Sequence, residues 1–234
     1  MDIKDGLRLV LAETRAREAA ELLPRCDDSP RPEGRWSVRD NLAHLAAWRD
    51  HAAHVLEAVH TGTPAPASSN DFDEENRKLF EASREMTAAE VRAEVDRSWD
   101  RLGAAMEACS EAELHDERPG ASEQEVWQVV PGNAHGHLAE HLGYWYMEAG
   151  DPGGAEAAAI WAHDLDNRAF PTRRARANAA YNLGCFYARA GRAVDALPHL
   201  QLAASLHPPI VAWARQDGDL DPVRDDPRIA VLLS

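Results

Sequence analysis

The chain has 234 residues, enough to bury an apolar core without disulfides or metal staples, as one large domain or as two small ones. Its net charge of −15 at pH 7 disfavours phosphate backbones and anionic lipids, so neither nucleic acid nor a membrane is an expected partner. No stretch is apolar enough for a membrane span, and the N-terminus has no secretory signal. We therefore expect a cytoplasmic protein whose widely spaced cysteines, Cys26, Cys109 and Cys185, are ordinary thiols.

Apolar residues recur at helical spacing through most of the chain, and no strand pattern of useful length is present. We expect helices over residues 3–23, 38–59, 73–84, 87–109 and 126–147, with a connector rich in Pro and Ser over 61–70. Two of these helices begin with capping signals, Ser37 followed by Asp40 and Thr87 followed by Glu90. The sequence thus predicts an all-α fold, an up-and-down four-helix bundle.

The functional hypothesis starts from His137 and His141, which lie four residues apart in a segment without an internal proline. On a helix they share a face, with Cβ atoms about 5–6 Å apart, and this spacing suits two imidazoles that chelate one metal ion. A third imidazole from another helix would complete a set with open coordination positions, as catalytic metal sites have, and His44 is the candidate. The alternative is a chance pair, since the chain contains eleven histidines.

Two segments, residues 36–48 and residues 126–141, carry motifs beyond the histidine spacing. They resemble the DinB-like superfamily, which includes mycothiol-dependent maleylpyruvate isomerases and bacillithiol transferases. The segment WSVRDNLAHLAAW, residues 36–48, is similar to the second-helix signature of that family. Residues 126–141 resemble its last-helix pattern, in which His or Glu is followed four residues later by His. The resemblance extends over residues 1–150. It implies a divalent metal on His44, His137 and His141, with water or a thiol in the open positions.

Zinc, nickel and iron all suit three imidazoles, so the pattern does not select among them. A low-molecular-weight thiol such as mycothiol is a second cofactor that the resemblance implies. Glu140, next to a ligand in sequence, either orients that ligand or acts as a base, or it is a solvated carboxylate on the helix face. Trp48 and Trp145 either line a substrate pocket or belong to the core. Asp40 and His51 are candidates for orienting a ligand imidazole, with His51 equally a residue at the rim of the site.

Beyond Gly150 the composition shifts toward Ala, and residues 181–208 resemble one tetratricopeptide repeat. Small residues at Gly184, Ala196 and Ala203 would let two antiparallel helices approach closely. A terminal capping helix is expected over residues 210–214. One or two repeats are too few for an extended peptide groove, which favours packing against the bundle. We expect the bundle over residues 1–150 and the extension over 151–234, the latter as an integral brace.

Two functions remain open at this point. The first is a metal-dependent enzyme that detoxifies an electrophilic small molecule, as a thiol-dependent transferase or isomerase or as a hydrolase. The second is a non-enzymatic module that binds a small molecule in stress or self-resistance and recruits a protein through the repeat-like helices. Fold alone does not choose between them. Many proteins of the family are dimers, so a two-fold homodimer is also expected.

Overall fold

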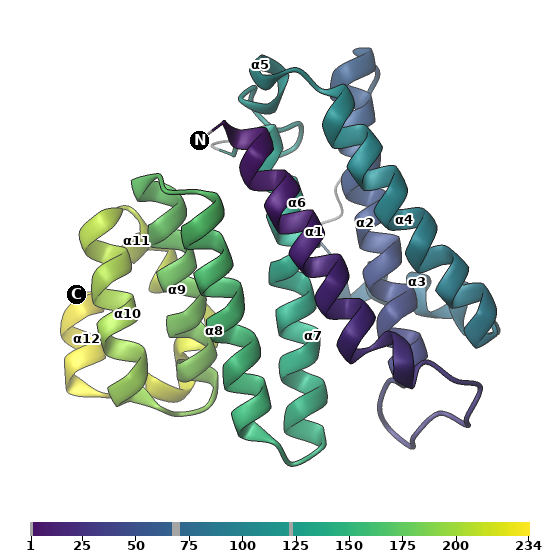
Figure 1. Ribbon diagram of the computed structural model, residues 1–234. Helices are drawn as coiled ribbons and strands as arrows, with labels where there is room; N and C mark the ends of the chain where they lie inside the picture. Colours follow the sequence, from purple (N-terminus) through teal and green to yellow (C-terminus); the bar gives the residue numbers. More distant parts are fainter. Residues whose placement is uncertain (1, 67–70, 122–123) are drawn as a thin grey trace. The chain divides into compact units, whose positions relative to one another are not determined.

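The computed structural model describes residues 2–66, 71–121 and 124–234 (Figure 1). Within these ranges there are helices and a single isolated bridge between Glu117 and Glu125, but no β-strand. The expected all-α fold is confirmed. Contacts divide the chain into two compact units, residues 1–141 and residues 142–234. No helix in the described ranges is both long and apolar enough to cross a membrane.

The first four helices follow the expected boundaries closely, whereas the short helix over Glu111–Leu114 was not expected. The helices of the first unit are α1 (Ile3–Glu21), α2 (Val38–Thr61), α3 (Phe72–Ser83), α4 (Ala88–Ala108), α5 (Glu111–Leu114), α6 (Val129–Asn133) and α7 (His135–Glu148), with short 3-10 turns at Leu23–Arg25 and Val126–Gln128. The predicted last helix is interrupted at Ala134, and the unit boundary falls inside α7. Part of the predicted connector, residues 67–70, lies outside the described residues.

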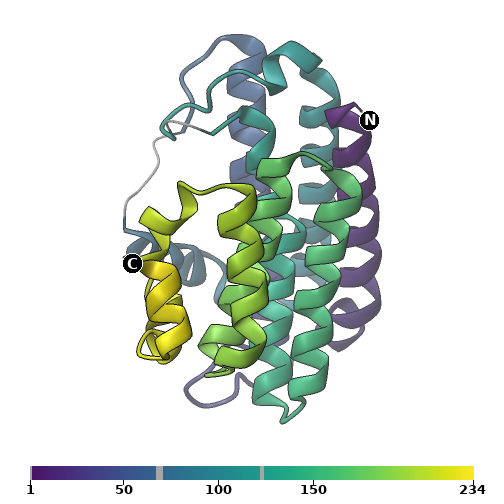
Figure 2. The same ribbon diagram turned by 90° about the vertical axis from the view of Figure 1, so that its left-hand side faces the viewer.

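Figure 1 shows the long helices α1, α2 and α4 of the first unit, and ion pairs along their lengths give their relative directions. Figure 2 shows the same ribbon turned by 90°. The ion pairs are Arg8 with Glu107 and Arg15 with Asp100 between α1 and α4, and Asp50 with Arg97 and Glu57 with Arg101 between α2 and α4. Helix α1 is therefore antiparallel to α4, whereas α2 and α4 run in the same direction. The connection between α2 and α4 allows this, because α3 runs back along α2, from Phe72 beside Trp48 to Phe80 beside Trp36.

A buried ion pair and the hydrogen bonds around it join three of these helices inside the first unit. Arg49 of α2 is 1% exposed and Glu18 of α1 is 0% exposed, and the guanidinium Nη1 donates to Glu18 Oε2 over 2.7 Å. The indole of Trp99 on α4 donates to the other carboxylate oxygen over 2.7 Å, and Arg49 Nε donates to Ser98 Oγ over 2.9 Å. The network binds α1, α2 and α4 together at one level of the core.

The second unit contains α8 (Pro152–Ala169), α9 (Arg173–Arg189), α10 (Ala193–Leu206), α11 (Ile210–Ala214), a 3-10 turn (Gly218–Val223) and α12 (Pro227–Leu233). Figures 1 and 2 show α9 and α10 side by side. Ala196 and Ala203 of α10 are fully buried, and a Cβ added at Gly184 of α9 would lie 2.8 Å from Leu200 Cδ2. The close approach expected at these small residues is present, and the helix expected over residues 210–214 is α11.

Candidate metal centre

The start of α2 sets the position of the first candidate ligand. Ser37 Oγ accepts the backbone N–H of Asp40 over 3.2 Å, and the Asp40 carboxylate accepts the N–H of Ser37 over 2.9 Å. This capping box begins the helix at Val38. From that start, Asn41, His44 and Trp48 follow at spacings of three and four residues and lie along one face. His44 is 5% exposed.

The other two candidate ligands lie in the first turns of α7. The chain leaves helical geometry at Ala134, with φ −113° and ψ −105°, and α7 starts afresh at His135. A Cβ at Gly136 would lie 3.3 Å from the carbonyl oxygen of Pro131, so a residue without a side chain suits this tight junction. The new helix then presents His137 and His141 on one face, one turn apart.

The three predicted imidazoles converge through the same ring atom. His137 Nε2 lies 3.0 Å from His44 Nε2 and 3.2 Å from His141 Nε2. An imidazole nitrogen carries one hydrogen or one lone pair, so hydrogen bonding satisfies at most one of these two contacts. Nitrogens bound at 2.0–2.1 Å to one metal are separated by about 2.9–3.4 Å in octahedral to tetrahedral geometry. The donor set and its spacing therefore fit a divalent metal.

Burial keeps these imidazoles in the form that binds metal. It lowers the pKa of His44 to about 3, with His141 adding to the shift, and lowers the pKa of His141 to about 4. The pKa of His137 is held well below its usual range by burial first, then by the two other imidazoles and the guanidinium of Arg49. All three rings are consequently neutral near pH 7, with a lone pair available for a metal.

Two indoles flank the three imidazoles. The ring of Trp36 lies 5.0 Å from that of His44 and 6.2 Å from that of His141, between ring centroids. The ring of Trp48 lies 6.3 Å from His44 and 6.4 Å from His137. Of the two tryptophans proposed from the sequence, Trp48 lies beside the imidazoles, while Trp145 packs on Tyr146. Trp36, which directly precedes the cap of α2, is an additional aromatic neighbour of the site.

Helix α3 packs on both indoles with one stripe of side chains spaced four residues apart. Phe72 contacts the ring of Trp48 at 6.1 Å, and Asn76 Oδ1 accepts the indole N–H of Trp48 over 3.1 Å. Phe80 stacks on Trp36 at 5.7 Å with an interplanar angle of 11°. The helix therefore adjoins the imidazoles through the two tryptophans and supplies them with apolar and amide groups.

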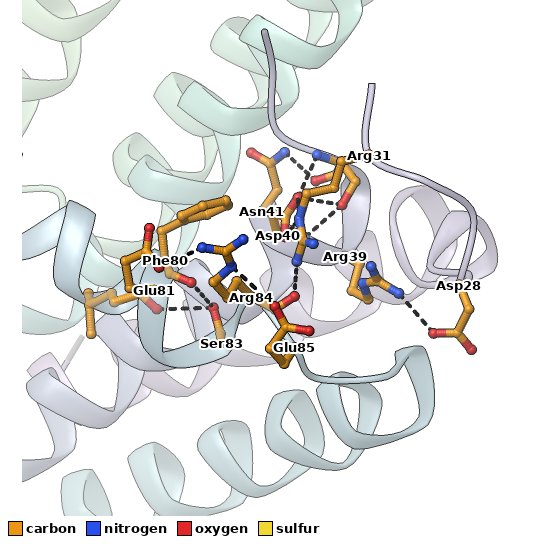
Figure 3. A network of polar contacts seen from close by, with 12 residues as sticks. Asp28, Arg31, Arg39, Asp40, Asn41, Phe80, Glu81, Ser83, Arg84 and Glu85 are labelled. Atoms are coloured by element: carbon orange, nitrogen blue, oxygen red, sulfur yellow. Dashed lines mark hydrogen bonds and ion pairs between the residues drawn. The ribbon is translucent and has the colours of Figure 1, made fainter. Parts of the chain in front are cut away.

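The expected orienting residues, Asp40 and His51, are engaged elsewhere. Arg31 Nε donates to the two carboxylate oxygens of Asp40 over 2.9 and 3.0 Å (Figure 3). The Ser37 hydroxyl also donates to this carboxylate, over 2.6 Å. His51 packs on Trp48 at 5.4 Å. The neighbour of Asp40, Asn41, reaches an imidazole instead, with its Oδ1 2.6 Å from His141 Nδ1. The spacing of Asn41 three residues before His44 was the available sequence signal.

The remaining predicted residues fall outside the convergence of the three rings. Glu140 is exposed on α7, and its proposed role as a base or orienting group stays a prediction. His135 is at the start of α7 and is 1% exposed. His54 and His115 are exposed.

The second unit holds another group of donor atoms that the sequence did not single out. Cys185, Asp217 and Asp219 lie close together. Both carboxylates already have partners, because Arg189 Nη1 pairs with Asp219 at 2.5 Å and the Tyr181 hydroxyl donates to Asp217 over 2.7 Å. This arrangement anchors the 3-10 turn to α9.

Residues 8–145 match the sequence profile of the DinB superfamily, and this match covers more than half of the chain. The chain belongs to the DinB superfamily. Members of this superfamily commonly bind a metal, in agreement with the three-His group in this unit. Comparisons with curated proteins and with solved structures yield no match. The resemblance inferred from residues 36–48 and 126–141 is confirmed at the level of the superfamily.

Proposed function

We propose that this DinB-superfamily protein holds a divalent metal on Nε2 of His44, His137 and His141 and acts on an electrophilic small molecule. The observation that carries the proposal is the pair of 3.0 and 3.2 Å contacts that meet on the single Nε2 atom of His137. Hydrogen bonds satisfy one such contact, whereas a metal accepts the lone pairs of all three rings. Zinc, nickel and iron each suit this donor set.

When bound, such a metal lowers the pKa of a coordinated water toward about 7 or holds a thiolate ready for attack on an electrophile. The residues of the chain have the other tasks. The three imidazoles hold the ion, and the indoles of Trp36 and Trp48 contact the apolar part of a substrate and exclude bulk water. Thiol-dependent transfer or isomerisation, with mycothiol or a similar thiol, and hydrolysis are the proposed reaction classes. Glu140 is the proposed base.

Metal analysis of the purified protein tests the first half of this proposal. The wild type should carry about one divalent ion per chain, and His137→Ala should lose it because two imidazoles remain. His54→Ala is the matched control, since His54 is an exposed histidine on α2. Metal content that is equal in all three proteins would contradict the three-His assignment.

A thiol-transfer assay tests the second half. With a low-molecular-weight thiol and an aromatic chloride, a new S–C bond forms at the ring carbon and chloride leaves, so chloride release measures turnover. Turnover should require the metal and should fall with His137→Ala. Glu140→Gln should reduce it by about 10²-fold or more if Glu140 moves a proton in the reaction. Activity that persists in metal-free protein would rule out this mechanism.

A ligand-binding module is the second candidate function, and the exposure of Glu140 favours it. A general base must lie within hydrogen-bonding distance of the proton that it takes, and a carboxylate exposed to solvent is a poor candidate for that role at a buried metal. In this case the first unit binds a small molecule without turnover, and the repeat-like helices α9 and α10 recruit a protein. Tight binding of the thiol with no chloride release in the same assay would support the module.

A further inference from the structure

We infer that Asn41 is a positioning residue for the three-His group: its side-chain carbonyl keeps the ring proton of His141 on Nδ1, so that Nε2 presents a lone pair to the metal. The supporting contact is the 2.6 Å separation between Asn41 Oδ1 and His141 Nδ1. The inference rests on the proposed function for the use of that lone pair. The orientation of the Asn41 side-chain amide does not depend on the proposed function.

The start of α2 fixes the orientation of the Asn41 amide. Asn41 Nδ2 donates to the carbonyl oxygen of Ser37 over 2.8 Å, and the backbone N–H of Asn41 donates to the same oxygen over 3.1 Å. The opposite orientation would place two carbonyl oxygens 2.8 Å apart with no hydrogen between them. The carbonyl of Asn41 must therefore face His141. An acceptor at that position requires a proton on Nδ1.

The same constraint selects the ring atom that faces the other imidazoles. A neutral imidazole with its proton on Nδ1 has its lone pair on Nε2. His141 Nε2 is the atom that lies 3.2 Å from His137 Nε2. Asn41 thus decides which nitrogen of His141 is the ligand, and it holds the plane of the ring, as partners of metal-binding histidines commonly do.

The other two rings lack an equivalent support among the described residues. His44 Nδ1 and His137 Nδ1 are buried there without a hydrogen-bond partner. His141 is therefore the ligand that is oriented before the metal arrives. Asp40, next to Asn41, is held by Ser37 and Arg31 and keeps the helix start rigid (Figure 3). The cap of α2 and the orientation of His141 are consequently coupled through two adjacent residues.

The test compares Asn41→Leu, which removes both amide contacts, with Asn41→Asp, which keeps an acceptor for His141 Nδ1 but loses the donor to the Ser37 carbonyl. The Kd for Zn²⁺ should rise by about 10–100-fold in Asn41→Leu and by less in Asn41→Asp. Long-range ¹H–¹⁵N spectra of the metal-free proteins should show His141 protonated on Nδ1 in the wild type and in Asn41→Asp, and a loss of that tautomer in Asn41→Leu. A purely structural role would not move the ring proton.

Asn167→Leu is the matched control, because Asn167 Nδ2 also donates to the carbonyl four residues earlier, that of His163, over 2.9 Å. It should leave the Kd for Zn²⁺ and the His141 tautomer unchanged. In Asn41→Leu, an unchanged tautomer or a change in Kd of less than about twofold would overturn the inference. If the wild type binds no Zn²⁺, the proposed function fails, and the tautomer comparison alone then decides the role of Asn41.

Discussion

At the level of single residues, the buried ion pair of Arg49 and Glu18 differs from the buried three-His group in how its polar atoms are paired. The Arg49 and Glu18 side chains are paired, and Ser98 and Trp99 supply further hydrogen bonds. In the three-His group, the Nε2 atoms face one another. Burying polar atoms without full partners costs about 1–3 kcal/mol each, so this second arrangement is a feature that a bound metal would stabilise. In this group, His44 Nδ1 and His137 Nδ1 are buried without a hydrogen-bond partner in the part of the chain that the structure describes.

Arg49→Met should lower the free energy of unfolding by about 3–5 kcal/mol, because it leaves the Glu18 carboxylate buried without its cation. The double variant Glu18→Gln with Arg49→Met should cost less than the sum of the single changes, since no charge is then left unpaired. Urea unfolding of the wild type, of Arg49→Met and Glu18→Gln alone, and of the double variant measures both effects. Arg15→Met is the control, since its pair with Asp100 is 45% and 71% exposed and should contribute about 0–1 kcal/mol. Additive single effects would contradict the coupling.

At the level of helices, local signals decide where each element begins, and close contacts decide which residues can occupy its interior. Ser37 and Thr87 cap α2 and α4 at the positions that their sequences indicate. Helix α7 restarts at His135 after the break at Ala134, so its imidazoles are placed by the break and not by a continuous helix. In the second unit, α9 approaches α10 most closely where Gly184 meets Leu200.

Gly184→Ala and Gly103→Ala should change stability in opposite directions. The added Cβ at Gly184 would lie 2.8 Å from Leu200 Cδ2 and 2.9 Å from Leu200 Cγ, so the Leu200 side chain or the helix that bears it must shift, at a cost of about 1–3 kcal/mol. At Gly103, inside α4, nothing lies within 4 Å, and the reduced backbone entropy should stabilise by about 0.4–1 kcal/mol. Thermal unfolding compares the two variants. Destabilisation at Gly103, or none at Gly184, would contradict this packing.

At the level of the whole molecule, the buried imidazoles couple folding to pH. Their pKa values in the folded state are lowered, to about 3 for His44 and about 4 for His141, whereas imidazoles in an unfolded chain titrate at about 6.5. Between these limits the unfolded state binds more protons than the folded state. Stability should therefore be retained above pH about 6.5 and be lost as pH falls toward about 4.

The predicted slope is about 1.4 kcal/mol per pH unit for each such imidazole in metal-free protein. Urea unfolding at pH 7 and pH 5 in the presence of a chelator measures it. His44→Gln should reduce the loss between the two pH values, because one buried imidazole is removed. His54→Gln, which changes an exposed histidine of the same helix, should not. An equal loss in the wild type and in His44→Gln would contradict the linkage.

The sequence by itself determined the features that depend on neighbours along the chain. Capping residues such as Ser37 and Thr87 act within one turn, so the helix starts and the all-α fold could be predicted from local patterns. The shared face of His137 and His141 follows from helical spacing alone. Motifs around His44 also identified the superfamily, because they occupy short continuous segments.

Only the tertiary structure decided which faces meet. His44 and His137 are 93 positions apart, and their 3.0 Å contact depends on how α2 packs against the start of α7. The same packing brings Asn41, and not Asp40, to His141, because adjacent residues on a helix point in different directions. The shared direction of α2 and α4 likewise depends on the crossover through α3. Local periodicity carries no information on these contacts between distant segments, since each side chain gains its partner only when the helices pack.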